Sequence, residues 1–129
     1  MASEGVQCWA FWPLFWETYF ESYVTESDIE WIAEKGFHSV RMPINARQLY
    51  SNTENGLDFD NATIERLDRL IHWCKKKNIY VILDMHGAPG GQTGANIDDS
   101  ESDLPELFME DSNISTLNEL WRMLALRYK

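Results

Sequence analysis

Three side chains near the ends of two predicted strands could do chemistry: Arg41, Asp84 and His86. A buried arginine is destabilising by several kcal/mol unless it is paired, so Arg41 predicts a carboxylate nearby. Asp84 is one candidate, and a carboxylate from a segment outside this sequence is another. Asp84 and His86 lie on the same face of their strand, which also raises the question of a metal. Two ligands fall short of a metal site, so no metal is predicted.

A glycine-rich segment, "HGAPGGQTG", follows the second strand. It has neither the GxxxxGK[ST] pattern nor a GxGxxG that opens a helix, so a phosphate loop is excluded. The glycines instead allow positive φ angles and close backbone approach. Gln92, Asn96, Asp98 and Asp99 supply amides and carboxylates that suit an uncharged, hydroxyl-rich ligand, which indicates a sugar. The alternative is a solvated acidic loop that binds nothing.

The composition restricts the partners. The 129 residues carry 21 acidic and 11 basic side chains, a net charge of −10, so neither nucleic acid nor an anionic membrane is expected as a partner. The longest apolar run, from Cys8 to Trp16, is too short to cross a bilayer, and no signal-peptide pattern precedes it. Cys8 and Cys74 form neither a disulfide framework nor a metal spacing. No cofactor is predicted, and the compartment stays open.

Helices and strands alternate along the chain. Two strands are predicted from their β-branched and aromatic residues, at 37–44 and 79–86. Three helices are predicted from periodicity and capping residues, at 25–36, 60–78 and 113–129. Thr25 or Ser27 could cap the first of these helices, and Asp60 caps the second. A further helix is expected after Pro13, together with a weak strand at Gly5–Phe11.

The connections and the strand faces favour a barrel. Helix-to-strand links are short, whereas the strand-to-helix links 45–59 and 87–111 are long, and in parallel α/β folds such loops form the working face. One face of each strand is wholly apolar, while the other becomes polar toward its end. A doubly wound sheet would require apolar residues on both faces. The prediction is therefore an α/β fold forming part of a (β/α) barrel.

Two segments, "SDIEWIAEKGFHSVRMPI" and "LDRLIHWCKKKNIYVILDMHGAPGGQTG", resemble the family-5 glycoside hydrolases, the cellulase and β-glucanase group. The resemblance runs from about Trp16 to Lys129, and residues 1–15 match poorly. It implies a (β/α)₈ TIM barrel. It also implies that Arg41 supports the catalytic nucleophile and that His86 lies in a sugar subsite.

The resemblance implies an incomplete site. The family's acid/base glutamate ends the fourth strand and its nucleophile ends the seventh, and both would lie beyond residue 129. A whole barrel needs about 250 residues, so 1–129 is predicted to be a single incomplete domain with roughly the first three βα units. We expect no catalytic residue within it, Arg41 and His86 as supporting residues, and substrate binding by Asp84, His86, Gln92 and Asn96.

The predicted function is that of a fragment of a retaining hydrolase whose intact form acts on a β-linked glucan, with the fragment alone inactive. Two alternatives stay open. One is a non-catalytic barrel piece that only binds carbohydrate or associates with itself through the open barrel edge. The other is a metal-dependent barrel hydrolase built on Asp84 and His86.

Overall fold

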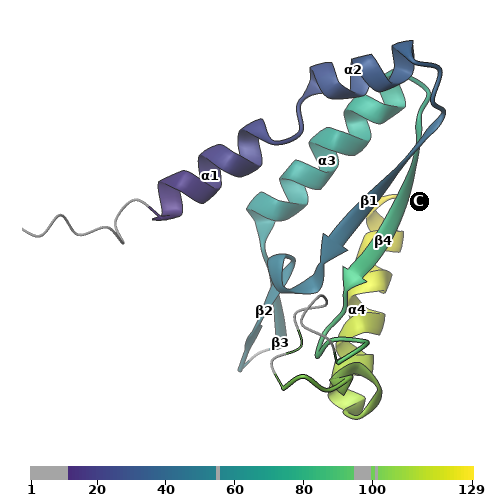
Figure 1. The fold of residues 1–129 in the computed structure, drawn as a ribbon. Helices are drawn as coiled ribbons and strands as arrows, with labels where there is room; N and C mark the ends of the chain where they lie inside the picture. The colour runs from purple at the N-terminus through teal and green to yellow at the C-terminus, as the bar shows by residue number, and fades with distance from the viewer. Residues whose placement is uncertain (1–11, 55, 95–99, 101) are drawn as a thin grey trace, which may run out of the picture.

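A computed structural model describes residues 12–54, 56–94, 100 and 102–129 (Figure 1). The helices are α1 (Trp12–Ser22), α2 (Glu26–Glu34), α3 (Asn61–Lys76) and α4 (Asp111–Arg127), and the strands are β1 (Ser39–Asn45), β2 (Tyr50–Thr53), β3 (Gly56–Phe59) and β4 (Tyr80–Gly87). Short 3₁₀ turns follow β1 (η2, Ala46–Gln48) and precede α4 (η4, Glu106–Phe108). The helix expected after Pro13 is α1. The weak strand expected at Gly5–Phe11 lies outside the described residues.

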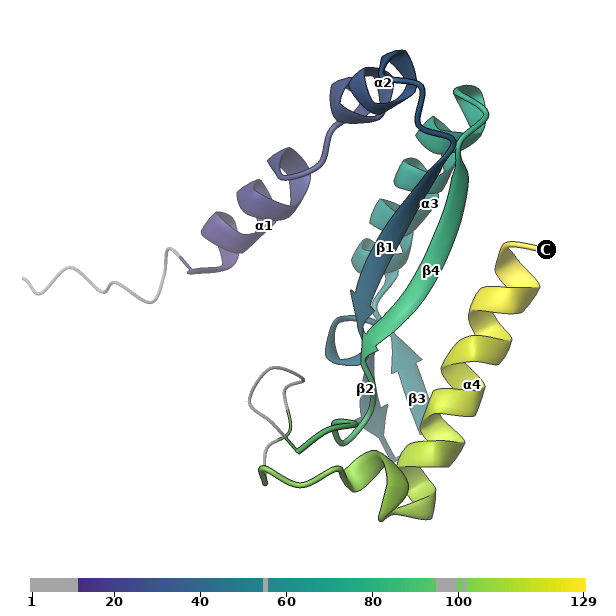
Figure 2. The ribbon, with the colours of Figure 1, turned by 45° about the vertical axis from the view of Figure 1, so that its right-hand side comes forward.

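The two predicted strands pair in parallel. The register aligns Ser39 with Tyr80 and Ile44 with Met85, and it shifts after Ile44, so that Asn45 aligns with Gly87. Helix α3 connects β1 to β4, and α4 follows β4 (Figures 1 and 2). The described residues thus contain two of the roughly three predicted βα units, with parallel strands as a partial (β/α) barrel requires.

The core lies on one face of this sheet. Alternate residues of both strands point into it, and α3 and α4 cover it; its buried members include Met42, Ile44, Met85, Leu67, Leu120 and Leu124. A second cluster joins α2 to the end of α3 through Ile29, Cys74 and Ile79. The predicted division of each strand into an apolar and a polar face is confirmed, because period-2 alternation places the apolar set under the helices.

The opposite sheet face is exposed. Tyr80 is 78% exposed and Ile82 is 54% exposed, although both are large apolar side chains in a strand. Within the described ranges, the β1–β4 sheet has no further strand. In a complete barrel this face would line the interior, and the free edges of β1 and β4 would pair with further strands.

Local capping chemistry fixes the helix boundaries. The sequence left Thr25 and Ser27 as alternative caps, and the structure uses Thr25 for α2. The Asp28 carboxylate accepts hydrogen bonds from the Thr25 N–H and hydroxyl, both at 2.8 Å, and these bonds lower the pKa of Asp28. For α3, Asp60 Oδ1 accepts from the Thr63 N–H at 2.6 Å. Gly36 ends the α2 segment with a φ of 79°, which glycine adopts without strain.

The segment 45–59 is not the plain loop that the sequence predicted. It contains η2 and an antiparallel hairpin in which Tyr50 aligns with Phe59 and Thr53 with Gly56. The Asn55-Gly56 dipeptide is the local signal that could have revealed a hairpin. The flanking residues lack clear apolar alternation, and Tyr50 and Phe59 gain their contacts only by packing against the core.

Helix α4 is held against α3 by polar contacts. Asp68 Oδ1 accepts from Arg127 Nε at 2.8 Å and from the Tyr128 hydroxyl at 3.1 Å, while Arg127 Nη2 also pairs with Asp68 Oδ2. Arg127 lowers the pKa of Asp68, and burial, with a contribution from Asp68, raises the pKa of Tyr128 to about 12.

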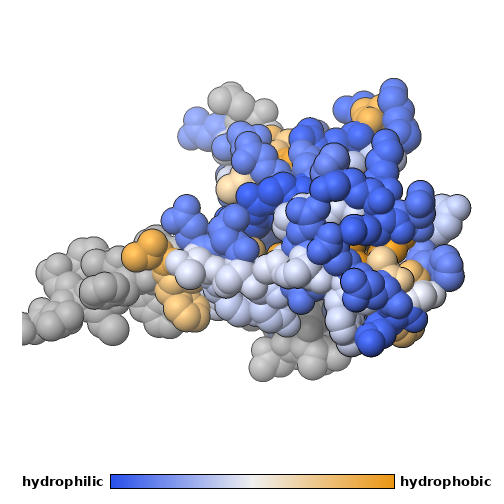
Figure 3. Space-filling view, turned by 90° about the horizontal axis from the view of Figure 1, so that it is seen from above, coloured by the Kyte–Doolittle hydropathy of each residue, from blue (hydrophilic) through white to orange (hydrophobic). Residues whose placement is uncertain are grey.

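The surface seen from above in Figure 3 is mostly hydrophilic, with hydrophobic side chains at the left of the view and smaller hydrophobic areas at its right. Leu14 and Phe15 of α1 are exposed. None of the described helices is both long and apolar enough to span a bilayer.

Candidate functional site

The structure brings Arg41, Asp84 and His86 together on one face of the β1–β4 sheet, and we call these three residues the Arg41 cluster. His86 lies at the carboxyl end of β4, whereas Arg41 is the third residue of β1 and reaches Asp84 and His86 with its long side chain. Arg41 Nε donates to Asp84 Oδ2 at 2.9 Å, and Arg41 Nη2 lies 2.6 Å from the same oxygen. The Arg41 side chain is 60% exposed and that of Asp84 is 26% exposed, so the pair lies on the open sheet face. The predicted pairing of Arg41 with Asp84 is confirmed. The prediction that Arg41 is buried is wrong for this chain, because no described segment packs against the sheet face that carries it.

His86 joins the pair through one ring nitrogen. Its Nδ1 lies 3.1 Å from Arg41 Nη2 and 3.1 Å from Asp84 Oδ2. When Nδ1 carries the proton it donates to the Asp84 carboxylate, and when Nδ1 is unprotonated it accepts from the Arg41 guanidinium. Within the described ranges, Nε2 has no hydrogen-bond partner. The imidazole is thus anchored at Nδ1, and its other nitrogen is available to a ligand.

The two oxygens of Asp84 differ in their surroundings. Oδ2 accepts a hydrogen bond from Arg41 Nε and lies 3.1 Å from His86 Nδ1, whereas Oδ1 makes no hydrogen bond to any described residue. Oδ1 can therefore accept a hydrogen bond from a hydroxyl group while Oδ2 holds the other two side chains in place.

The glycine loop is held by its own glutamine. Gln92 Oε1 accepts from the Ala88 N–H at 2.9 Å, and Gln92 Nε2 donates to the His86 carbonyl at 2.8 Å. Gln92 therefore fixes the backbone that carries His86. Its predicted contact with substrate stays a prediction.

The glycines have the two uses expected of them. Gly90 and Gly91 have φ angles of 76° and 73°. A Cβ on Gly87 would lie 2.8 Å from Asn45 Nδ2, and one on Gly90 would lie 2.2 Å from Asn113 Nδ2. The contacts of Asn45 and Asn113 with the loop were not predicted from the sequence, since they depend on the folded register.

The remaining predicted residues can be placed only in part. Asn96, Asp98 and Asp99 lie outside the described residues, as does Cys8. Cys74 is fully buried, and burial raises the pKa of its thiol. Where the structure describes the chain, no group of three or more His, Cys, Asp or Glu side chains could hold a metal ion.

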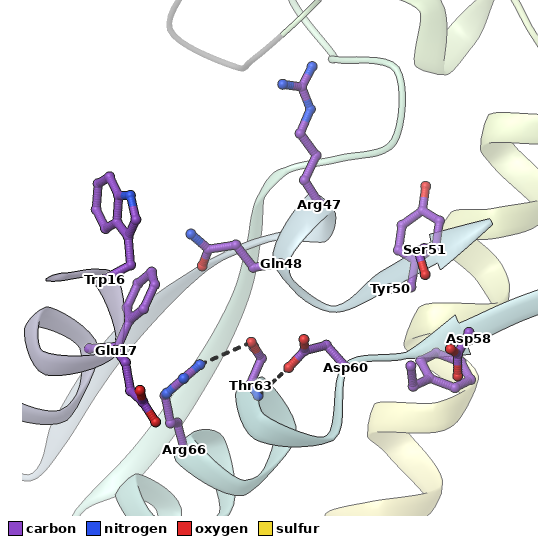
Figure 4. A pocket seen from close by; sticks show the side chains of 12 residues that line it. Trp16, Glu17, Arg47, Gln48, Tyr50, Ser51, Asp58, Asp60, Thr63 and Arg66 are labelled. Carbon is purple, nitrogen blue, oxygen red and sulfur yellow. Dashed lines mark hydrogen bonds between the residues drawn. The ribbon is translucent and has the colours of Figure 1, made fainter. Parts of the chain in front are cut away.

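A cleft of about 690 Å³ also lies at the carboxyl end of β1, and sequence reasoning missed it (Figure 4). It is lined by residues from α1, η2, the hairpin and the start of α3, and we call it the α1 cleft. None of its lining residues belongs to the Arg41 cluster. No local pattern could reveal it, because its walls are far apart in the sequence.

Parallel βα units whose helices cover only one sheet face, with charged groups on the other, are those of a barrel-type α/β protein, and comparison with known proteins identifies the family. The model of the cellulase family, glycosyl hydrolase family 5, matches residues 2–129. The chain belongs to this family. The resemblance inferred from the sequence is therefore confirmed.

Individual relatives match most of the chain at modest identity. The chain is 34% identical to endoglucanase C of Acetivibrio thermocellus over 115 residues, which are 89% of this chain and 32% of the relative. It is 30% identical to a probable glucan 1,3-beta-glucosidase A of Aspergillus fumigatus over 110 residues, which are 85% of this chain and 26% of the relative. The chain thus spans about a third or less of these relatives' length.

A solved structure shows the same fold. The crystal structure of rutinosidase from Aspergillus niger superposes with a TM-score of 0.63 at 23% sequence identity. The match covers 78% of this chain and 28% of that one. The share of the neighbour that is covered agrees with a partial barrel.

Proposed function

We propose that residues 1–129 form the first part of a retaining family-5 hydrolase that cleaves a β-linked glucan. The observation that carries this proposal is the Arg41 cluster, in which an arginine, a carboxylate and an imidazole meet on one face of two parallel strands, with His86 at the carboxyl end of β4. In barrel enzymes, catalytic groups gather at this end of the strands. The relatives' names, an endoglucanase and a glucan 1,3-beta-glucosidase, support a β-glucan as the substrate.

In this proposal the chain supplies the supporting half of the active site. Retaining hydrolysis uses two carboxyl groups about 5–5.5 Å apart, one as acid/base and one as nucleophile. The proposal places both on glutamates beyond residue 129. Arg41 projects donors from the open sheet face, where they can orient the nucleophile and stabilise its charge.

His86 and Asp84 are proposed to bind the sugar. His86 Nε2 and Asp84 Oδ1 both lack a partner among the described residues. Asp84 Oδ1 can accept a hydrogen bond from a sugar hydroxyl, and His86 Nε2 can donate or accept one according to its tautomer. Gln92 is proposed to hold the loop that presents them, and Asn96 to add a further amide contact.

By itself the chain is proposed to be inactive. The Arg41 cluster contains one carboxylate, Asp84, and its Oδ2 is already occupied by Arg41. One carboxylate cannot both protonate the leaving oxygen and attack the anomeric carbon from the opposite side.

The test is hydrolysis of soluble β-1,3- and β-1,4-glucans by the chain extended through a complete barrel. Proton NMR of the first product should show the β-anomer, because the retaining mechanism inverts the anomeric carbon twice. Initial release of the α-anomer would contradict retention. Absence of hydrolysis of every β-glucan would contradict the proposed substrate.

A second candidate function is self-association without catalysis. The exposed Tyr80 and Ile82 and the unpaired edges of the described β1–β4 sheet favour it, since open edges and apolar faces pair readily with other chains. It applies to the chain as a separate protein and does not conflict with hydrolysis by a complete barrel.

A further inference from the structure

Two N-glycosylation sequons occur in the chain, and the proposed function uses neither. The pattern is Asn-x-Ser/Thr with x other than proline, and residues 61–63 (Asn-Ala-Thr) and 113–115 (Asn-Ile-Ser) match it. So short a pattern also arises by chance, and the surroundings of each asparagine therefore decide which one could carry a glycan. A glycan is bulky and hydrophilic, so it requires an asparagine at the surface.

Asn61 is the first residue of α3, and it is exposed together with its neighbours Asp60, Ala62 and Glu65. Its side-chain amide makes no hydrogen bond to any described residue. The capping of α3 depends on Asp60 instead, whose Oδ1 accepts from the Thr63 N–H at 2.6 Å (Figure 4). Replacing one amide hydrogen of Asn61 by a sugar therefore breaks no hydrogen bond among the described residues.

Asn113, in the first turn of α4, has the opposite surroundings. It is half-buried, and its Nδ2 donates to the Glu106 carbonyl at 3.1 Å. A Cβ on Gly90 would lie 2.2 Å from the same nitrogen, so the glycine loop packs directly against it. A sugar attached to this nitrogen would need the space that the loop occupies.

We propose that Asn61 is an N-glycan acceptor when the chain is exported through a compartment that holds an oligosaccharyltransferase, and that Asn113 is a structural residue. The donor is an oligosaccharide joined through pyrophosphate to a polyisoprenol lipid. Nδ2 of Asn61 attacks the anomeric carbon and gives up one proton, while the pyrophosphate leaves with the electron pair of the broken C–O bond. One C–N bond replaces one C–O bond, and nothing is oxidised or reduced.

The contacts of Thr63 indicate when the transfer occurs. The sequon requires its hydroxyl group, yet in the folded chain Thr63 Oγ1 accepts from Arg66 Nη1 at 3.3 Å. The transfer therefore precedes the closing of α3, and the fold then determines which glycan can be kept. A glycan on Asn61 leaves α3 and its cap intact, whereas one on Asn113 would keep the glycine loop from reaching α4.

The test is export of the full chain from yeast cells behind a cleavable secretion leader, with peptide mapping of the medium and of the cell extract. Peptide-N-glycosidase in ¹⁸O-labelled water removes each glycan and converts its asparagine into labelled aspartate. We expect the label at Asn61 in both fractions and none at Asn113 in the secreted chain. Asn61→Gln and Thr63→Ala should each abolish the labelling of residue 61, whereas Asn113→Gln should leave it unchanged.

Asn52 is a control within the same tryptic peptide, residues 48–66. It is exposed like Asn61, but Glu54 stands where a sequon requires Ser or Thr, so no label is expected there. An unlabelled Asn61 in both fractions would overturn the proposal. So would a secreted chain labelled at Asn113, or equal labelling of Asn52 and Asn61. None of these results bears on hydrolysis by a complete barrel, so the proposed function stands or falls separately.

Discussion

Arg41 of β1 and Asp84 of β4 form a side-chain ion pair across two adjacent parallel strands, with Arg41 Nε and Nη2 at 2.9 and 2.6 Å from one carboxylate oxygen. The register aligns Arg41 with Ile82, so Asp84 lies two residues further along the neighbouring strand. The pair orients the arginine while leaving Asp84 Oδ1 without a described partner.

Removing the charge of Asp84 should impair the proposed site. In a complete barrel, Asp84→Asn should lower kcat/KM on β-glucan by about 100-fold, because Arg41 and His86 lose the group that fixes their positions. Glu65→Gln on the exposed side of α3 is the control and should have no effect. Steady-state kinetics measure both variants, and equal activity of Asp84→Asn and Glu65→Gln would contradict the positioning role.

Gly90→Ala should destabilise the chain more than Gly36→Ala. Both glycines have positive φ, 76° and 79°, so both alanines are strained by about 1 kcal/mol or more. Only at Gly90 would the new Cβ clash, 2.2 Å from Asn113 Nδ2, whereas nothing lies within 4 Å at Gly36. Urea unfolding followed by circular dichroism compares the two, and equal losses would show that the loop does not approach α4 so closely.

Acid should weaken the contact between α3 and α4. Arg127 holds the pKa of Asp68 below 3.8, so the stabilisation is present above about pH 4 and is lost as the pH falls through the lowered pKa. The urea midpoint should therefore fall as the pH is lowered below about 4. In Asp68→Asn the fall should be smaller, because this variant has no carboxylate at position 68 to protonate. An identical acid response in that variant would contradict this assignment.

Alkali should weaken the same contact through Tyr128. Its pKa is raised from 10.0 to about 12, so the folded state favours the neutral phenol. That contribution is complete below pH 10 and is lost between pH 10 and 12. In Tyr128→Phe the urea midpoint should therefore fall less between pH 10 and 12 than in the unchanged chain. In Tyr80→Phe, on the exposed sheet face, it should fall as in the unchanged chain.

The separate chain should associate with itself. Sedimentation velocity should show oligomers that dissociate on dilution, because the open sheet face exposes Tyr80 and Ile82. Ile82→Lys should reduce association through charge repulsion at this face, and Leu126→Lys on α4, also exposed, is the control. A stable dilute monomer with a sharp thermal transition would contradict this prediction.

Local signals in the sequence were enough to predict much of the fold. Asp60 marked the start of α3, and alternation in β1 separated Met42 and Ile44 from Arg41. The same parity predicted that Arg41 and Asp84 would meet, because side-chain direction in a strand follows from position alone.

Features that depend on tertiary packing could not be predicted. The hairpin contains polar residues such as Ser51 and Asn52, and it is anchored by the packing of Tyr50 and Phe59 on the core. The α1 cleft requires residues near Trp16 to meet residues near Asp58, which no periodicity encodes. Arg41 is exposed because no described segment covers its face of the sheet. Whether that face is covered depends on the strands of a complete barrel, which no pattern around Arg41 can indicate.

The central claim is that residues 1–129 hold the supporting half of a glycosidase site without its catalytic pair. It is tested most directly by assaying the purified chain on aryl β-glucosides and soluble β-glucan, beside the complete barrel. We predict turnover by the complete barrel and none by the chain alone. Turnover by the short chain that disappears in its Asp84→Asn variant would contradict the claim, because it would place a catalytic carboxylate within these residues.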